Sequence, residues 1–304
     1  MRRIGLLLLA VVPVVAGTLF YLFGPGGSDA APVAAQTASP RNAKDAKARA
    51  EQSAPTQKSE DDQVIADAPP GLAAPAKKEL AQKIVSTAEN STLRWRTAYD
   101  RVEDIGDGCG YTAGIIGFCT GTHDLLSLVE HYTEDHPGNG LEPYLPALRK
   151  VDGTDSHQGL DPGFRAAWKA EAQLPVFRAA QDHERDHVYF APSVRLAKLD
   201  GLGTLGQFIY YDAMVFHGPG IDRDGFYVLR DRAMEKVKTP AEGGDEKTYL
   251  STFLGIRRAA MKERRATLDT SRIDTAQRRF LANGNMDLTT PLVWSVYGER
   301  YRLP

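Results

Sequence analysis

Apolar residues recur at helical spacing along most of the chain. Between residues 76 and 91, Leu80, Ile84 and Ala88 occupy every fourth position, so a helix would carry them on one face. The apolar residues of 125–132 repeat this spacing. Further helical patterns cover residues 163–173, 175–189, 192–202, 205–216, 225–238, 245–264 and 275–283. The periodicity therefore predicts a mainly α-helical domain.

Patterns typical of β-strands are scarce. The best candidate joins residues 93–104 to residues 111–118 through a glycine-rich turn at 105–110. Together these segments predict one irregular hairpin. The predicted fold class is mainly α (α+β), with a single small sheet.

The N-terminal part of the chain follows another pattern. Two arginines precede residues 4–23, an uncharged run that is typical of a secretory signal and also about long enough to cross a bilayer. Small residues at 28–30 or 33–35 would suit cleavage. We expect residues 1–30 to be a signal peptide or an uncleaved signal anchor. Either would export the chain, with membrane attachment only if the segment is retained.

Residues 31–76 are rich in Ala, Pro, Gln, Ser, Lys and Asp and contain almost no aromatic side chain. Such a segment cannot bury enough apolar surface to offset the entropy lost on ordering, so it is predicted to be a disordered linker. All three tryptophans lie beyond it. Residues 77–304 are therefore predicted to form one folded, extracellular domain.

Composition and charge exclude several classes of protein. Of the 304 residues, 42% are hydrophobic, too many for a wholly disordered chain, and two cysteines are too few for a disulfide scaffold. The net charge of −2 offers no basic surface for nucleic acid, so no nucleic-acid partner is expected.

Carboxylates gather in one short part of the sequence. Glu89 ends the first predicted helix, and Glu103, Asp104 and Asp107 surround the glycine-rich turn. Neighbouring carboxyl groups raise one another's pKa, and burial raises it further, so such a site can hold one protonated and one ionised carboxyl. Glycoside hydrolysis uses that combination. From spacing alone, a turn aspartate and a solvated helix glutamate remain the simpler interpretation.

Longer motifs identify a family. The chain reads STAENST at 86–92, EDIGDGCGYT at 103–112 and GIIGFCTGT at 114–122, with HGPG at 217–220 further on. In these motifs it resembles the bacterial chitosanases of glycoside hydrolase family 46. The resemblance spans about residues 77–301.

The resemblance implies a two-lobed, lysozyme-like fold with the active-site cleft between the lobes. It implies internal cleavage of the β-1,4 linkages of chitosan, a cationic glucosamine polymer, with inversion of the anomeric carbon. Glu89 would be the general acid, Asp107 the general base, and Thr112 would help to position the attacking water. We expect a monomer that needs no cofactor and no metal.

Further residues match family positions around the sugar. Glu103, Asp104 and Asp124 would face the cationic substrate, with Asp124 the strongest candidate to bind an ammonium group; a solvated surface charge is the alternative for each. Tyr189 would stack on a sugar, although a role in the core is almost as well supported.

Three charged residues match a network that accompanies the catalytic site in the family: Asp212, Arg257 and Arg272. Buried ionic groups persist only when they are paired. We therefore expect these residues to lie behind Asp107, hold it in place and keep it ionised.

Some residues depart from the family pattern. Cys109 stands where close relatives commonly carry an arginine, while Cys119 matches a family cysteine; the pair can be bridged or free, and export would permit the bond. Residues 262–265 read KERR and are more basic than expected, with Glu263 as the only nearby carboxylate.

The segment from His183 to His187 reads HERDH, which matches the HExxH motif of zinc peptidases. No glutamate follows between residues 188 and 233, so only His217 or an aspartate such as Asp200 could complete a site from that stretch. We expect an ordinary salt-bridged helix here.

Two other functions stay open. One is a glycosidase acting on acetylated polymers such as chitin or peptidoglycan, and the other is a non-catalytic, surface carbohydrate-binding protein.

Overall fold

The structure is a computed structural model that describes residues 58–304. The predicted signal segment and part of the predicted linker, residues 1–57, lie outside the described residues. Within the rest of that linker, residues 58–67 are helical, and Asp62 pairs with Arg195 at 2.7 Å. The structure therefore differs from the expectation of disorder in this stretch. No helix in residues 58–304 is long and apolar enough to span a membrane.

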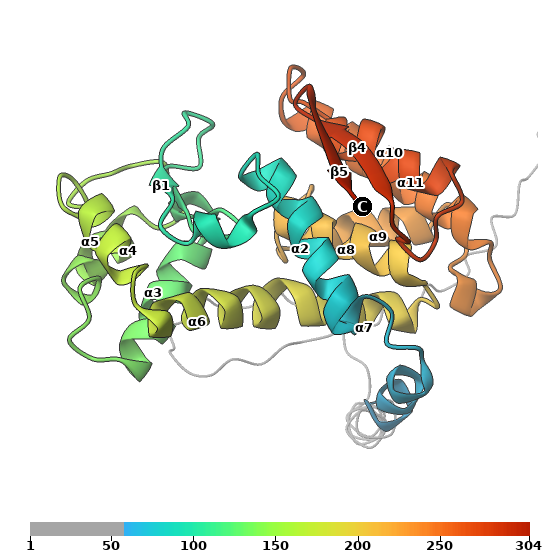
Figure 1. The fold of residues 1–304 in the computed structure, drawn as a ribbon, viewed down its shortest axis with the longest axis horizontal. Helices are drawn as coiled ribbons and strands as arrows, with labels where there is room; N and C mark the ends of the chain where they lie inside the picture. The colour runs from blue at the N-terminus through green and yellow to red at the C-terminus, as the bar shows by residue number, and fades with distance from the viewer. Residues whose placement is uncertain (1–57) are drawn as a thin grey trace, which may run out of the picture. The chain divides into compact units, whose positions relative to one another are not determined.

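Helices dominate the described chain, as the periodicity predicts (Figure 1). Beyond residues 58–67, the α-helices are α2 (Pro75–Glu89), α3 (Asp124–Asp135), α4 (Leu145–Val151), α5 (Phe164–Glu171), α6 (Pro175–Glu184), α7 (Ala191–Leu199), α8 (Thr204–His217), α9 (Phe226–Met234), α10 (Glu246–Arg264) and α11 (Arg278–Ala282). Two π-helical segments, η5 (Arg185–Phe190) and η7 (Arg272–Gln277), continue these helices. The mainly α-helical fold is confirmed.

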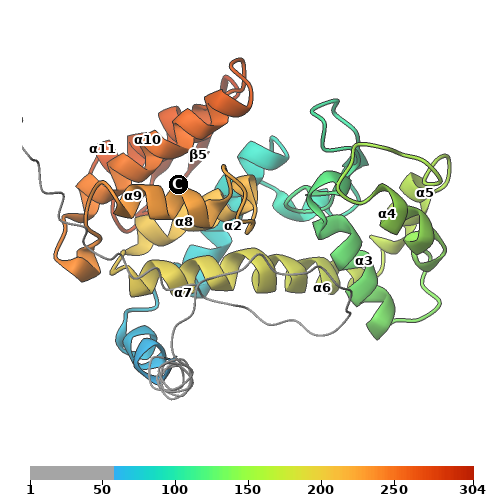
Figure 2. The ribbon, with the colours of Figure 1, turned by 180° about the vertical axis from the view of Figure 1, so that it is seen from behind.

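The helices form two lobes. One lobe contains α3, α4 and α5, and the other contains α8 to α11; α2 lies between them (Figures 1 and 2). The run formed by α6, η5 and α7 extends beneath both lobes without a break in helical backbone. The two-lobed architecture is as expected.

Helix α2 ends at Glu89, the first of the candidate carboxylates. Pro75 occupies the first turn, where its missing N–H costs nothing. Ile84 and Val85 are buried on the face toward the core. The helix ends at Glu89, and Ser91 adopts a positive φ of 51°, which turns the chain away. Glu89 is therefore the last residue of a helix whose apolar face is packed into the core.

Helix α8 is buried on nearly all sides. Its residues Leu205 to Met214 are all among the buried residues. A helix that is apolar around its circumference belongs inside a lobe rather than on its surface. Asp212 lies on this helix and is only 2% exposed, so it must be paired.

The first sheet is smaller than the sequence predicts. It consists of β1 (Val102–Glu103), β2 (Thr112–Ala113) and β3 (Phe118–Cys119), paired antiparallel in that order. The expected strand over 93–104 is wrong for most of its length, because residues 95–98 form a 3-10 helix with Trp95 buried. The register aligns Glu103 with Thr112 and Thr112 with Cys119.

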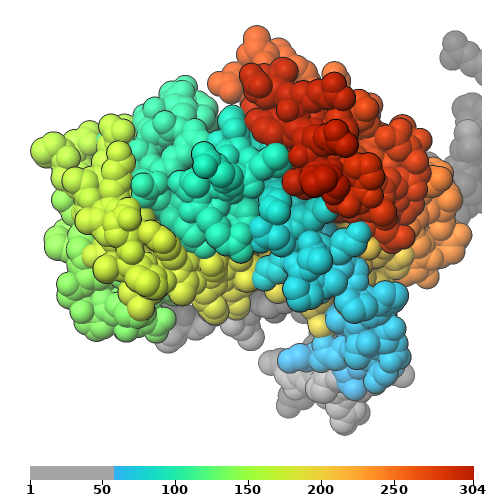
Figure 3. Space-filling model, viewed as in Figure 1, coloured from blue at the N-terminus to red at the C-terminus, as the bar shows by residue number. Residues whose placement is uncertain are grey.

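A second sheet was not predicted. It is a hairpin of β4 (Leu292–Val296) and β5 (Glu299–Leu303), with alternating burial along β4 and Trp294 fully buried. The turn residues Tyr297 and Gly298 have φ values of 51° and 82°. Two positive φ angles are typical of the tight turns that suit hairpin twist. Figure 3 shows this red hairpin meeting the teal segments of the chain on the face seen in Figure 1.

Candidate active site

Glu89 is held by a buried ionic network. Arg272 Nη2 donates to Glu89 Oε1 at 2.7 Å and to Asp212 Oδ1 at 2.9 Å. Arg257 Nη2 donates to Asp212 Oδ2 at 3.0 Å, and Gln277 Nε2 donates to the same oxygen at 2.5 Å. The network therefore reaches Glu89 through Arg272.

This arrangement corrects one expectation from the sequence. Asp212, Arg257 and Arg272 do form a buried network, but the carboxyl it holds is Glu89, whereas none of its hydrogen bonds within residues 58–304 goes to Asp107. The physical reason is that η7 packs near the end of α2, which brings Arg272 to a partner 183 residues away in the chain. Sequence position alone gives no access to that contact.

Burial and the network together shift the pKa values of the two carboxyls in opposite directions. Burial raises the pKa of Glu89 above its ordinary value, although Arg272 opposes that change. Burial would also raise the pKa of Asp212, but Arg272 and Arg257 outweigh it and lower the pKa. Asp212 therefore stays ionised to a lower pH than an ordinary aspartate, while Glu89 stays protonated to a higher pH than an ordinary glutamate. A carboxyl of that kind can donate a proton.

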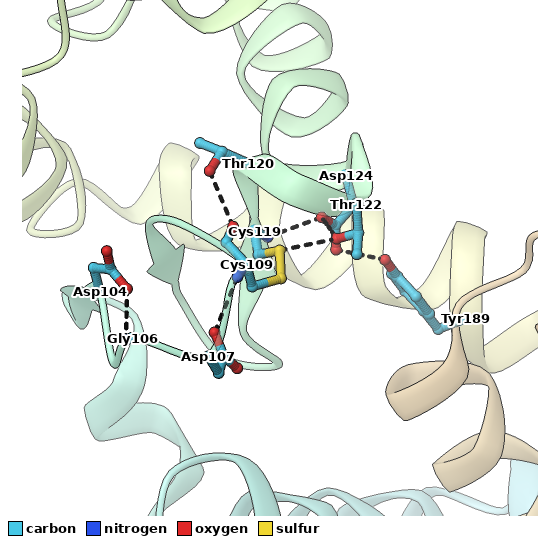
Figure 4. Close-up of a disulfide and its surroundings, with 9 residues drawn as sticks. All are labelled: Asp104, Gly106, Asp107, Cys109, Cys119, Thr120, Thr122, Asp124 and Tyr189. Atoms are coloured by element: carbon cyan, nitrogen blue, oxygen red, sulfur yellow. Dashed lines mark hydrogen bonds between the residues drawn. A yellow bond between two sulfur atoms is a disulfide. The ribbon is translucent and has the colours of Figure 1, made fainter. Parts of the chain in front are cut away.

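Asp107 lies in a very different environment. It is exposed on the loop between β1 and β2, flanked by Gly106 and Gly108 with φ values of 71° and 89°. A Cβ added at either glycine would meet nothing within 4 Å. Asp107 Oδ1 accepts a hydrogen bond from the backbone N–H of Cys109 at 3.1 Å (Figure 4). The loop thus presents a carboxylate with open space around it.

Thr112 and Glu89 approach each other around Gly117. A Cβ added at Gly117 would lie 3.1 Å from Thr112 Cγ2 and 3.8 Å from Glu89 Oε2. Gly117 also has a φ of 77°, which other residues rarely adopt. Because Gly117 has no side chain, Thr112 of β2 and Glu89 at the end of α2 can both lie next to it. The structure thus brings Thr112 and Glu89 near each other, and the role of Thr112 in positioning water stays a prediction.

Glu103 and Asp104 are partly exposed and already have partners. Arg101 Nε donates to Glu103 Oε1 at 2.8 Å, and Arg101 Nη1 donates to Asn90 Oδ1 at 3.2 Å. Asp104 Oδ1 accepts the N–H of Gly106 at 2.7 Å, and its Oδ2 lies 3.2 Å from His157 Nε2. Both carboxylates can meet a substrate, but each would do so in competition with a side chain of the protein, Arg101 or His157.

Next to this pair lies a cavity of about 460 Å³. Asn90, Arg101 and Glu103 line it together with Arg165 and Lys169. Asn90 directly follows Glu89, so the cavity adjoins the end of α2. Neither Asn90 nor Arg101 stands out in the sequence as a site residue, because an isolated Asn or Arg carries no distinctive spacing.

Asp124 and Tyr189 contact each other. Tyr189 OH donates to Asp124 Oδ2 at 2.6 Å, while the N–H of Cys119 donates to Asp124 Oδ1 at 2.8 Å (Figure 4). Tyr189 is only 3% exposed. Both oxygens of Asp124 are thus used inside the protein, and burial raises its pKa despite these hydrogen bonds. These contacts favour a structural role, and sugar binding by the two residues stays a prediction.

Cys109 and Cys119 form a disulfide, which settles the choice that the sequence left open (Figure 4). The bridge joins the loop that carries Asp107 to strand β3. Thr120 Oγ1 and the N–H of Gly121 also donate to the carbonyl of Cys109, at 3.1 and 2.9 Å. The end of the loop nearest Asp107 is therefore fixed to the sheet.

Tyr297 is a further candidate that the sequence did not single out. It is 47% exposed in the β4–β5 turn, and its N–H donates to Ser271 Oγ at 2.9 Å, beside Arg272. Burial raises the pKa of Tyr297, Arg272 lowers it, and Glu89 raises it further. An exposed aromatic ring thus lies within electrostatic reach of the candidate acid. The missed hairpin explains why it was overlooked.

The HExxH segment does not assemble a metal site. His183 and His187 are exposed with stacked rings 5.7 Å apart, whereas Glu184 is buried and pairs with His131 Nδ1 at 3.0 Å. In the part of the chain that the structure describes, no three His, Cys, Asp or Glu side chains are placed to hold a metal ion. The glutamate therefore serves a contact between α6 and α3.

Comparison with known proteins identifies close relatives. The model of glycosyl hydrolase family 46 matches residues 83–292. A chitosanase of Streptomyces sp. (strain N174) is 57% identical over 231 residues, which cover 76% of this chain and 83% of the relative. The solved structure of chitosanase OU01 with substrate is 53% identical, with a TM-score of 0.75, covering 77% of this chain and 99% of that one. A Gynuella sunshinyii chitosanase solved with chitotetraose is 35% identical, with a TM-score of 0.69, covering 75% and 97%.

Proposed function

The chain belongs to glycosyl hydrolase family 46, and from that membership we propose how its site cleaves a glucosamine polymer. The protein is a glycoside hydrolase of the chitosanase type, and its substrate is chitosan. The proposal concerns the roles of individual residues, the stereochemistry and the location of the enzyme.

Glu89 acts as the general acid. The observation that carries this assignment is its 2.7 Å contact with Arg272 at the end of α2, in a setting that raises its pKa. The protonated carboxyl donates its proton to the glycosidic oxygen as the bond to the anomeric carbon breaks. Once Glu89 is ionised, Arg272 stabilises the new charge. The guanidinium group of Arg272 thus contacts Glu89 before the proton is transferred and stabilises its charge afterwards.

Asp107 acts as the general base. Its exposed loop leaves room for a water molecule between the carboxylate and the sugar, which an inverting mechanism requires. The hydroxyl of Thr112, on β2, orients that water. Asp107 removes a proton from the water as its oxygen attacks the anomeric carbon from the face opposite the leaving group. The product therefore has the inverted configuration.

The substrate's ammonium groups bind to partly exposed carboxylates. Glu103 and Asp104 are 39% and 31% exposed at their side chains, so cationic sugars can reach them. Binding exchanges the Arg101 and His157 contacts for contacts with ammonium groups. Tyr297 offers an aromatic face to a sugar on the opposite lobe. Acetylated sugars carry no such charge, so they gain less from this site.

We also propose that the enzyme is exported as a monomer. The uncharged run at 4–23 supports export, since it follows two arginines at the start of the chain. A polymeric substrate is met outside the cell, which agrees with that placement.

The test is hydrolysis of chitosan by the purified protein, with the anomer of the first product followed by proton NMR. We expect the inverted anomer from the wild type and a loss of at least about 100-fold in kcat for Glu89→Gln and for Asp107→Asn. Asp231→Asn, an exposed carboxylate on α9, is the matched control and should retain activity. A retained configuration would refute the assigned roles. Faster cleavage of highly acetylated polymer than of chitosan would refute the proposed substrate preference.

A further inference from the structure

The loop that carries Asp107 is weakly held at its tip. Ile105 is 60% exposed, and the positions of Gly106 and Gly108 face open space. The side-chain hydrogen bonds here are local, from the N–H of Gly106 to Asp104 and from the N–H of Cys109 to Asp107. These contacts shape the turn, and the contact of Asp104 Oδ2 with His157 Nε2 at 3.2 Å lies at the start of the loop rather than at its tip.

Cys109 is where the loop becomes attached. Its N–H donates to Asp107 Oδ1, its carbonyl accepts from Thr120 and Gly121, and its sulfur bonds to Cys119 (Figure 4). One residue therefore contacts the carboxylate directly and is covalently joined to β3. Any movement of Cys109 moves the hydrogen-bond donor of Asp107.

The other end of the bridge lies in a firmly held region. Cys119 is 1% exposed, pairs with Thr112 in the sheet register, and donates its N–H to Asp124. Asp124 is in turn bonded to Tyr189 of η5, which is buried. The disulfide thus connects the exposed loop to the strand next to Thr112 and to the long helical run beneath both lobes.

We propose that the Cys109–Cys119 disulfide is a positioning element for Asp107, and that catalysis by this chain depends on the bridge being intact. This inference rests on the proposed role of Asp107. A base must be held near a defined position relative to the attacking water, and a displacement of about 1 Å can cost about 100-fold in rate. Opening the bridge leaves Cys109 itself held by two hydrogen bonds to its carbonyl, which do not fix the side-chain direction at Asp107.

Reduction provides a reversible way to open the bridge. Dithiothreitol supplies two electrons and two protons, the S–S bond breaks, Cys109 and Cys119 become thiols, and the reagent becomes a cyclic disulfide. Removal of the reagent in air restores the bridge. The same full-length protein can therefore be measured in both states.

The experiment compares kcat and KM on a soluble glucosamine oligomer for the oxidised, reduced and reoxidised wild type and for Cys109→Ser/Cys119→Ser. Thiol titration establishes the state of each sample, and near-ultraviolet circular dichroism establishes that it is folded. We expect kcat to fall about 10-fold to 100-fold on reduction, KM to change less than twofold, and reoxidation to restore kcat. The serine variant should match the reduced enzyme and should not respond to dithiothreitol.

Several results would overturn the proposal. One is a kcat within twofold of the oxidised value when two thiols are titrated, and another is a rise in KM at constant kcat. A reduced wild type that loses its circular dichroism signal also contradicts it, because the bridge would then maintain the whole fold. The oxidised wild type is measured first. If it is inactive on chitosan, the proposed function fails before the bridge is opened.

Discussion

Removing Arg272 from the network behind Glu89 tests how that network sets the acid. The Arg272→Met variant keeps a long side chain but loses the guanidinium group that contacts both Glu89 and Asp212. Asp212 would keep Arg257 and Gln277 as partners. The perturbation therefore removes one cation from a buried cluster without leaving Asp212 unpaired.

The expected cost to stability follows from the burial of these groups. Arg272 and Asp212 are each 3% exposed at their side chains, so the charges have little access to water. Breaking a buried pair by removing one partner lowers the free energy of unfolding by about 3–5 kcal/mol. Because Asp212 keeps other partners, we expect a loss of about 3 kcal/mol here. For a domain of this size that corresponds to a decrease in Tm of roughly 6–12 °C.

The expected effect on activity has a definite sign. Arg272 lowers the pKa of Glu89, so its removal raises that pKa and moves the alkaline limb of kcat/KM to higher pH. Asp212 raises the pKa of Glu89, so Asp212→Asn removes a nearby negative charge and moves the same limb to lower pH. The two variants are therefore expected to shift the limb in opposite directions.

The assay measures kcat/KM on a glucosamine oligomer from acidic to alkaline pH, at a temperature well below the Tm of each variant, with Asp231→Asn as control. Shifts of both variants in the same direction, or no shift in either, would refute the reasoning about Glu89. An unchanged Tm in Arg272→Met would refute the claim that the buried pair contributes to stability.

Three further outcomes follow from the site. Burial raises the pKa of Glu89 in the folded protein above its unfolded value of about 4.3. The contribution of protonated Glu89 to the free energy of unfolding is therefore complete below the unfolded pKa and is lost as pH rises through the folded pKa. Urea denaturation should therefore show Glu89→Gln gaining stability relative to wild type between acidic and neutral pH. Tyr297→Leu should raise KM several-fold with kcat within about twofold in steady-state kinetics, since stacking contributes to binding rather than to proton transfer. Glu299→Gln in the same hairpin should leave both constants unchanged. Asp124→Asn should lower Tm, because the Tyr189 and Cys119 contacts weaken, and calorimetry would measure it.

The sequence predicted the helices well because their apolar faces repeat over many turns. The expected helix at 76–91 is α2 within two residues at each end, and the one at 245–264 is α10 within one. The strands were harder, since β1, β2 and β3 have two residues each and no period can be read from such short segments. Strand β4 is long enough to alternate in burial, with Leu292, Trp294 and Val296 buried, and this alternation is the signal that the sequence offers for it.

The sequence indicates several members of the candidate site but not the contacts between them. The motifs around Glu89, Asp107 and Thr112 come from the family resemblance, and the structure adds the common space around Gly117. The partner of Arg272 could not be predicted, because it depends on how η7 packs against the end of α2. The state of Cys109 also needed coordinates, since a spacing of ten residues allows a bridge without requiring one.

The unbroken helical run from α6 through η5 to α7 cannot easily gain or lose a residue. Each residue of a helix turns the following part by about 100°. Deleting one residue from η5 would therefore rotate α7, which packs against α8, relative to α6, which packs against α3. Tyr189 and Asp124 would lose their contact, or α7 would lose its packing. Although this segment is not assigned to the reaction, its number of residues fixes the rotation of α7 relative to α6 about the helix axis. The segment should therefore tolerate substitution far better than insertion or deletion.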